Sequence, residues 1–208
     1  QIYSLCKSVA SDRGIFLTYG NYAGDVLNFN QAQERLNAEG IPTKTVVVTD
    51  DIMSAKKDEI EKRRGIAGDL IIFKIAGAAS SDRYSLDEIV RVSKEANART
   101  RTIGVAFSGC TLPGAQKPLF TVPYGVMALG LGIHGEPGLA EVPIPSAKDM
   151  AKDLIDRLLD ETPERCQKEG AKLVVLLNGL GGVKYEELFL LYKEVFAILE
   201  SKNITTVS

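Results

Sequence analysis

The sequence is poor in the residues that build metal sites and disulfide frameworks, and it has no long apolar run. It contains one histidine and three cysteines in 208 residues. One histidine excludes a histidine-rich metal site, and Cys6, Cys110 and Cys166 fit no metal spacing and cannot all pair within the chain. We therefore expect a reducing, cytoplasmic setting. The apolar runs stay well short of the ~20 residues of a membrane-spanning helix, so no membrane association is expected.

The chain also lacks an excess of charge of one sign. Lys and Arg number 25 against 27 Asp and Glu, a formal net charge of -2, and the two signs are interspersed. No basic stripe is available to neutralise phosphates, so a nucleic-acid partner is not expected. The first residues do not form a secretory signal. Because the sequence does not begin with Met, we expect a processed chain or a piece of a longer one.

What remains is the composition of a globular protein, with 45% apolar and 25% charged residues. Short β-branched runs alternate with helical patterns, which predicts an α/β fold. The expected strands cover residues 15–19, 43–49, 103–107, 127–133 and 173–177, with a strand beginning in 204–207. The expected helices cover residues 25–39, 70–79, 146–159 and 185–199, with others opening at the Ser85 capping box and at Thr162. A composition shift near residues 99–102 predicts two lobes, residues 1–100 and 101–208.

His134 is the first candidate for chemistry. It follows a predicted strand, where α/β proteins place their functional groups, and Gly132 and Gly135 leave the backbone beside it uncrowded. A neutral imidazole nitrogen is a nucleophile as well as a base. Glu136 either orients this ring or forms a turn with Pro137, and the spacing leaves both interpretations open.

Acidic residues supply the other candidates. Asp25 opens a predicted helix after Gly24, so it is either the N-cap, which local sequence favours, or a general base for a hydroxyl. Asp50 and Asp51 follow a predicted strand, where turn formers and functional residues are both common. The glycine-rich residues 178–182 could hold a phosphate at a helix start, but a structural turn is favoured because no P-loop or Gly-x-Gly-x-x-Gly pattern is present.

Two segments carry a specific resemblance to a known family. Residues 20–29 read Gly-Asn-Tyr-Ala-Gly-Asp-Val-Leu-Asn-Phe, and residues 130–138 read Gly-Leu-Gly-Ile-His-Gly-Glu-Pro-Gly. Together with Arg63-Arg64-Gly65, residues 74–79 and residues 178–182, their order and spacing resemble the substrate-binding K subunit of dihydroxyacetone (glycerone) kinases over essentially the whole chain. The resemblance implies two α/β lobes with mixed, largely parallel sheets. Residues 1–100 would then be the C-terminal part of the first lobe, and residues 101–208 the second.

The resemblance also implies a chemistry. His134 would attack the ketone carbon of dihydroxyacetone and hold it as a covalent hemiaminal, which selects a ketone over glycerol. Asp25 would take the proton from the primary hydroxyl during phosphoryl transfer. No cofactor would bind this chain directly, because ATP or ADP with Mg²⁺ would sit on an L-type partner subunit or domain. A cytoplasmic homodimer in glycerol metabolism is expected, while some family members are non-catalytic coactivators that sense the ketose.

Three departures from the family pattern limit what is carried over. The family's N-terminal Gly-rich segment with a second histidine is absent, and the strand beginning at residues 204–207 stops at the chain end. We therefore expect a central fragment that is inactive alone. Gly20 stands where some members carry Lys, which we expect to leave room for another short ketose such as erythrulose. Met127-Ala128-Leu129 also departs from the family pattern, with no physical consequence that we can derive.

Overall fold

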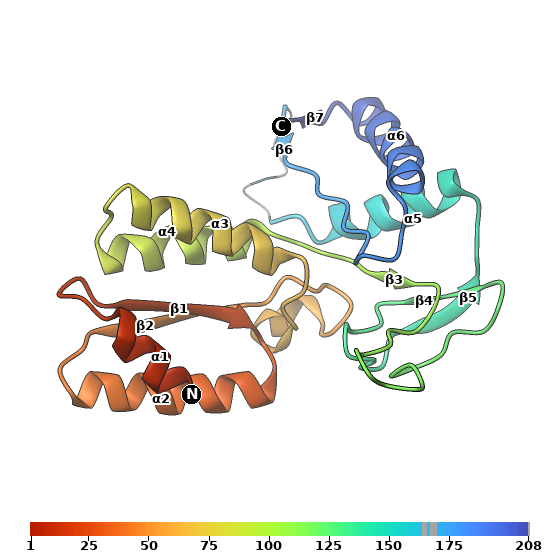
Figure 1. Ribbon diagram of the computed structural model, residues 1–208. Coiled ribbons are helices and arrows are strands. Elements are labelled where there is room, and N and C mark those ends of the chain that lie inside the picture. The colour runs from red at the N-terminus through yellow and green to blue at the C-terminus, as the bar shows by residue number, and fades with distance from the viewer. Residues whose placement is uncertain (164–165, 167–169, 208) are drawn as a thin grey trace. The chain divides into compact units, whose positions relative to one another are not determined.

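The computed structural model describes residues 1–163, 166 and 170–207, which divide into two compact units, Gln1–Thr102 and Ile103–Ser208 (Figure 1). Helices and short strands alternate in both, so the α/β expectation is confirmed. The helix expected to open at Thr162 runs into residues 164–165 and 167–169, which lie outside the described residues. Within the described ranges, no helix is long and apolar enough to cross a membrane.

The first unit is a three-layer arrangement around one pair of parallel strands. Strand β1 pairs with β2 from Ile15 opposite Thr43 to Gly20 opposite Val48. Helices α1 and α2 lie on one side of the pair and α3 and α4 on the other (Figure 1). In chain order the elements are α1 (Ile2–Val9), β1 (Ile15–Gly20), α2 (Ala23–Ala38), β2 (Thr43–Val48), the 3-10 helix η1 (Lys57–Lys62), α3 (Gly68–Ser81) and α4 (Leu86–Arg99).

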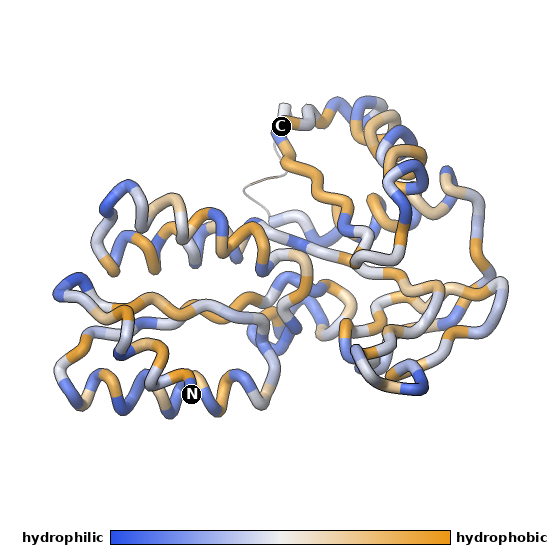
Figure 2. Tube along the Cα trace, viewed as in Figure 1, coloured by the Kyte–Doolittle hydropathy of each residue, from blue (hydrophilic) through white to orange (hydrophobic). Residues whose placement is uncertain are grey.

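Side-chain alternation along β1 explains the three layers, because successive residues of a strand point to opposite faces. Ile15 and Leu17 are buried with Leu36 of α2 in one apolar cluster. Phe16, between them in sequence, packs instead against a second cluster, which contains Ala76 and Ile89 of the opposite helices. Figure 2 shows apolar and polar residues alternating along α2, as expected for a helix with one face on a sheet.

Helix boundaries in this unit follow the sequence signals closely. The Ser85 hydroxyl accepts a hydrogen bond from the backbone of Glu88, and the Glu88 carboxylate accepts from the Ser85 backbone, so the predicted capping box is present. The apolar run at residues 70–79 is helical, as predicted, and its small residues Ala76 and Ala79 are buried. Helix α1 was not predicted from the sequence.

The second unit combines a small antiparallel sheet with a pair of packed helices. Strands β3 (Val105–Ala106), β4 (Val126–Leu129) and β5 (Ala140–Pro143) form the sheet in that order. Strand β6 (Lys172–Leu173) pairs in parallel with β7 (Thr205–Thr206). The helices α5 (Ala147–Asp160) and α6 (Tyr185–Ser201) share a core that includes Ile155 and Leu199.

The strands of this unit are shorter than predicted. The strand expected at residues 127–133 ends at Leu129, because Gly130 adopts a left-handed conformation with φ of 72° and turns the chain. Residues 103–107 contribute only Val105 and Ala106 to a ladder, and residues 173–177 contribute only Leu173, the second residue of β6. Apolar runs therefore indicated the positions of these strands but overestimated their lengths. Strand β5, whose residues are mostly exposed, was not predicted.

Candidate functional site

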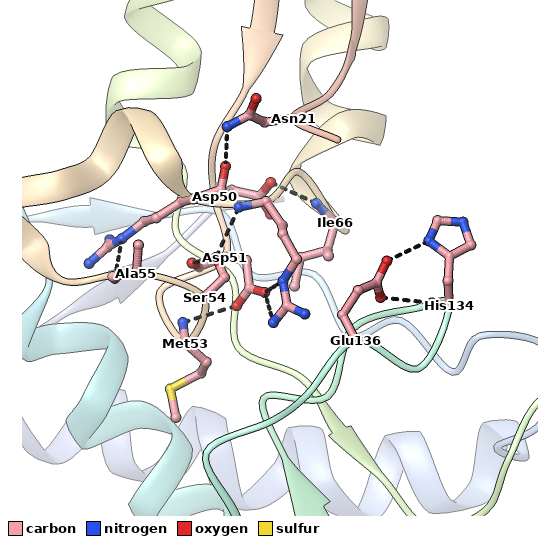
Figure 3. Close-up of polar contacts among 11 residues, drawn as sticks. Asn21, Asp50, Asp51, Met53, Ser54, Ala55, Ile66, His134 and Glu136 are labelled. Atoms are coloured by element: carbon pink, nitrogen blue, oxygen red, sulfur yellow. Dashed lines mark hydrogen bonds and ion pairs between the residues drawn. The ribbon is translucent and has the colours of Figure 1, made fainter. Parts of the chain in front are cut away.

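The turn after β4 fixes His134 against Glu136. The Nδ1 atom of His134 lies 2.9 Å from Oε1 of Glu136, and the backbone N–H of His134 donates to Oε2 of the same carboxylate at 3.0 Å (Figure 3). The turn itself is closed by the Gly132 N–H, which donates to the Glu136 carbonyl at 3.0 Å. Of the two interpretations of Glu136, orientation of the ring is the one that this geometry supports.

This arrangement assigns the ring protons. A carboxylate only accepts hydrogen bonds, so Nδ1 carries the proton that faces Glu136, and Nε2 of the neutral ring keeps its lone pair. Partial burial raises the pKa of Glu136, but hydrogen bonds from backbone and from His134 outweigh it and leave that pKa below its usual value. Glu136 is therefore ionised at neutral pH. The His134 side chain is 60% exposed, so reagents in solution can reach the ring.

A glycine and an aromatic ring hold this turn in place. Gly135 has φ of 90°, and a Cβ on it would lie 2.8 Å from Cδ1 of Phe120. Phe120 belongs to the long Gly/Pro-rich connection of residues 108–124, where the Leu119 N–H donates to the Cys110 carbonyl at 2.8 Å. The connection therefore contacts the residue directly after His134.

Asp25 lies in the first turn of α2 and is exposed. The N-cap of α2 is Tyr22, and its side chain makes no cap hydrogen bond. The capping role favoured for Asp25 by local sequence is therefore wrong, because the helix begins two residues earlier than predicted. An open hollow of about 720 Å³ borders this turn. Its lining residues are Asn21, Ala23, Val26, Leu27, Asn30, Gln31, Glu34 and Lys62.

Asn21 ties the end of β1 to the segment that carries Arg63, Arg64 and Gly65. Its side-chain amide donates to the Glu61 carbonyl at 3.0 Å and to the Arg63 carbonyl at 2.9 Å. Its backbone N–H donates to the Val48 carbonyl at 3.1 Å. Within the Asn-Tyr-x-Gly-Asp motif, Asn21 thus has a structural role that the sequence did not indicate.

Asp50 and Asp51 are structural rather than exposed functional groups. Both are fully buried, with exposed fractions of 0% and 1%. Asp50 accepts hydrogen bonds from the Ile66 N–H at 2.9 Å and the Gly68 N–H at 2.7 Å, and it thereby caps α3. Asp51 forms an ion pair with Arg64 at 2.8 Å (Figure 3). Burial raises the pKa of Asp51, and the opposing effect of Arg64, which lowers it, is smaller.

Asp69 is a titratable residue that the sequence reasoning missed. It lies in the first turn of α3, and its carboxyl group contacts the end of β1. A Cβ on Gly20 would lie 3.0 Å from Asp69 Oδ2, 2.9 Å from the Gly65 carbonyl and 3.1 Å from the Tyr22 ring. The space beside position 20 is therefore filled by these groups. Burial, followed by the charges of Asp50 and Asp25, raises the pKa of Asp69 to about 7.

The glycine-rich residues 178–182 form a turn before α6. The Leu180 N–H donates to the Asn178 side chain at 3.0 Å, and the Gly182 and Val183 N–H groups donate to the Gly179 carbonyl at 3.0 Å. These N–H groups are used within the turn, which agrees with the interpretation of a structural turn. Across the described ranges, no group of three or more His, Cys, Asp or Glu side chains could hold a metal ion.

Comparison with known proteins decides the family. The Dak1 domain model matches residues 1–208, the whole chain. The chain belongs to the Dak1 family, the substrate-binding domain of dihydroxyacetone kinases. The resemblance inferred from residues 20–29 and 130–138 is thereby confirmed.

Its relatives include kinases for short ketoses. The chain is 54% identical over 208 residues to an L-erythrulose kinase of Pectobacterium atrosepticum, covering 100% of the chain and 35% of that protein. It is 41% identical over 202 residues to the dihydroxyacetone-binding subunit of a PTS-dependent dihydroxyacetone kinase of Listeria innocua, covering 97% of the chain and 60% of that protein.

A solved structure supports the fold. The co-activator of a dihydroxyacetone kinase operon superposes with a TM-score of 0.88 at 30% identity, over 99% of this chain and 62% of that one. The chain thus spans about a third of the length of the L-erythrulose kinase and about three fifths of the length of the other two proteins.

Proposed function

We propose that this chain is the substrate-binding part of a kinase that phosphorylates the primary hydroxyl of a short ketose. The observation that carries the proposal is the pair His134 and Glu136, because a carboxylate at Nδ1 leaves Nε2 as the nucleophilic nitrogen of the ring. Membership of the Dak1 family and the identity to named ketose kinases support the kinase class.

In the proposed tether, the lone pair of Nε2 attacks the carbonyl carbon of the ketose. The π electron pair of the C=O bond moves to oxygen, which takes a proton from solvent and becomes a hydroxyl. The new C–N bond leaves a positive charge on the ring, and the Glu136 carboxylate at Nδ1 offsets that charge. Glycerol has no electrophilic carbon and cannot form this bond, so the tether discriminates by chemistry rather than by fit.

In the proposed transfer, the terminal hydroxyl oxygen attacks the terminal phosphorus of ATP while Asp25 takes the hydroxyl proton. The bond from that phosphorus to the bridging oxygen breaks, and ADP leaves. The nucleotide and its Mg²⁺ would be held by an L-type subunit or domain. Phosphoryl transfer depends mainly on positioning and charge stabilisation, and the covalent tether would supply positioning. We further propose that the kinase is a cytoplasmic homodimer and that these 208 residues have no kinase activity by themselves.

We infer that the substrate is a three- or four-carbon ketose, with erythrulose the first to test. The 54% identity to an L-erythrulose kinase favours it over dihydroxyacetone. The likeness to an operon co-activator supports a second candidate, a protein that binds the ketose only to signal it. Phosphorylation of a ketose in the presence of an L-type partner separates the two, since only the kinase turns substrate over.

The direct test is NMR with ketoses labelled with ¹³C at the carbonyl. Dihydroxyacetone and erythrulose are added in turn to the chain and to its His134→Ala variant. The proposal expects a bound carbon that changes from ketone-like to tetrahedral, and only where His134 is present. A folded chain that gives no tetrahedral signal with either ketose, while a longer chain extended to the length of the relatives also gives none, contradicts the tether.

A further inference from the structure

The carboxyl group of Asp69 occupies a niche that requires two glycines. A Cβ on Gly65 would lie 2.9 Å from Oδ1 of Asp69 and 2.4 Å from the Cα of Gly20, and a Cβ on Gly20 would lie 3.0 Å from Oδ2. A Cβ this close to the backbone of the other segment cannot be accommodated unless that backbone moves, whereas the flexible Asp69 carboxyl group could give way. The backbone of β1 and of the segment before α3 therefore approach closely enough to seat a carboxyl group, and a side chain at either glycine would displace it.

Several side-chain oxygen atoms around the end of β1 are buried without a hydrogen-bond partner among the described residues. They include Oδ1 of Asp69, the hydroxyl of Thr18 and the hydroxyl of Tyr19, the residue before Gly20. The Tyr19 side chain is 7% exposed and stacks on Phe29. Leaving such a group unpaired costs about 1–3 kcal/mol in a folded protein, so each one in a native structure needs an explanation.

Electrostatics connects both groups to Asp25. The Asp25 charge acts on Asp69 and also on Tyr19, raising the pKa of each in addition to the larger effect of burial. The end of β1 therefore brings together the proposed general base, an unpaired carboxyl oxygen and an unpaired phenol. A molecule that carries several hydroxyl groups is the kind of ligand that pairs such atoms.

We propose that Asp69 is a specificity-determining residue whose carboxylate accepts a hydrogen bond from a hydroxyl group of the ketose. This ketose is the proposed substrate, whose primary hydroxyl loses its proton to Asp25. This inference rests on the proposed function and adds to it a contact within the first unit. Gly20 and Gly65 act through Asp69, because they leave the space in which its carboxyl group lies. The contact selects ligands that present a hydroxyl donor at this point over ligands that present an acceptor.

The charged surroundings of Asp69 make the contact dependent on pH. From the end of β2 it faces Asp50 and from α2 it faces Asp25, both of which disfavour its ionised form. In the segment before α3, Arg64 is held by Asp51, and the Arg63 Nε donates to the Ala55 carbonyl at 3.0 Å. A hydroxyl donor stabilises the carboxylate, so ketose binding should lower the pKa of Asp69 from about 7.

The test compares ketose affinity of the unaltered chain and of Asp69→Asn at pH 5.5 and pH 8. Affinity is measured from the tetrahedral ¹³C signal, and the ratio of the two dissociation constants at each pH cancels pH effects that both proteins share. We expect Asp69→Asn to bind about tenfold more weakly at pH 8 and nearly equally at pH 5.5, where Asp69 is protonated. Asp87→Asn removes the acid at the same position of α4 and should leave affinity unchanged.

A second measurement uses the unaltered chain alone. With ¹³Cγ-labelled aspartate, the titration of Asp69 should shift to lower pH when ketose is added. An affinity ratio of one at pH 8, a ratio that does not change with pH, or an Asp69 titration that ketose does not move would each overturn the inference. Failure of both the unaltered chain and the longer chain to bind either ketose would instead overturn the proposed function, and this inference with it.

Discussion

Both carboxylate oxygens of Glu136 bind His134, one at the ring Nδ1 and the other at the backbone N–H, at 2.9 Å and 3.0 Å. The second bond fixes the carboxylate to the main chain, and the first then fixes the imidazole to the carboxylate. The direction of the ring and the identity of its protonated nitrogen are therefore set by a residue only two positions away. The Phe120 contact at Gly135 then holds the turn that carries both residues.

The first prediction concerns Glu136→Gln. The Gln amide has one oxygen and one NH₂ group, so it cannot accept both hydrogen bonds that the carboxylate accepts. An NH₂ group at Nδ1 favours the ring tautomer protonated at Nε2, which has no lone pair for the ketone. We expect hemiaminal formation to fall about tenfold and the fraction of the Nδ1-protonated tautomer to fall with it. Both are measured by NMR, with ¹⁵N-labelled histidine for the tautomer.

Glu141→Gln is the matched control, because Glu141 is an exposed acid in β5 of the same unit. It should leave tautomer and tether unchanged. Equal tethering by Glu136→Gln and Glu141→Gln, with the tautomer unaltered in both, would show that Glu136 does not orient the ring.

The second prediction separates backbone strain from crowding at Gly135. Gly135 and Gly114 both have positive φ, at 90° and 81°, but only a Cβ on Gly135 meets a neighbour, Phe120 at 2.8 Å. Either substitution to Ala should cost about 1 kcal/mol of unfolding free energy through the backbone. Only Gly135→Ala should also move the His134 resonances and weaken the tether, as followed by NMR and urea unfolding. Identical effects of the two variants would contradict the role of the Phe120 contact.

Local signals in the sequence were sufficient for the parts of the fold that depend on local chemistry. The Ser85 capping box, the helix at residues 70–79 and the strand opening at Ile15 follow from residue types and spacing within a few positions. The pairing of His134 with Glu136 was one of two open interpretations, since residues two apart in a loop meet only if the turn closes. The Gly132 N–H closes that turn on the Glu136 carbonyl.

The features that were missed depend on contacts between distant segments. Asp69 looks like an ordinary first-turn acid in sequence, and only the approach of Gly20 and Gly65 gives it a buried environment. The sequence left Asp50 and Asp51 open as turn formers or functional residues, and only the folded chain brings backbone N–H groups and Arg64 to them. No periodicity or motif within one segment encodes such contacts between residues that are distant in the sequence.

The third prediction concerns Asp25→Asn in the proposed kinase, assembled with its proposed nucleotide-binding partner. Asn cannot take the hydroxyl proton, so we expect kcat to fall about 10²- to 10⁴-fold, the usual contribution of a general base. The hemiaminal signal should persist, because the tether does not use Asp25. Glu34→Gln, an exposed acid in the same helix, is the control. Loss of the hemiaminal together with turnover would show instead that Asp25 is needed for binding.

The fourth prediction is structural and concerns Asp50→Asn. Asp50 accepts hydrogen bonds from the Ile66 and Gly68 N–H groups, and its side chain is completely buried. An Asn amide turns its NH₂ toward one of these donors and leaves it unpaired. We expect a loss of about 2–3 kcal/mol in unfolding free energy, measured by urea titration. Asp58→Asn, on the exposed η1, should change stability by less than about 0.5 kcal/mol, and an equal loss in both would remove the capping role.

The fifth prediction follows from the raised pKa of Asp69. Its ordinary value is 3.8, and in the folded chain burial, Asp50 and Asp25 raise the pKa of Asp69 to about 7. Between these values the folded state holds a proton that the unfolded state has lost. The stability that this group contributes is therefore complete below pH 3.8 and is lost as the pH rises through about 7.

Asp69→Asn carries no titrating group at this position and should escape that loss. The quantity to compare is the unfolding free energy of Asp69→Asn minus that of the unaltered chain. This difference should be about 1–3 kcal/mol larger at pH 8 than at pH 5, after allowance for solvent screening of a partly exposed carboxyl. Urea titrations at the two pH values measure this difference. Asp87→Asn, at the matching position of α4, should show no such dependence. A difference between Asp69→Asn and the unaltered chain that stays constant with pH would mean that Asp69 is ionised in the folded chain throughout this range. The niche formed by Gly20 and Gly65 would then be open to solvent.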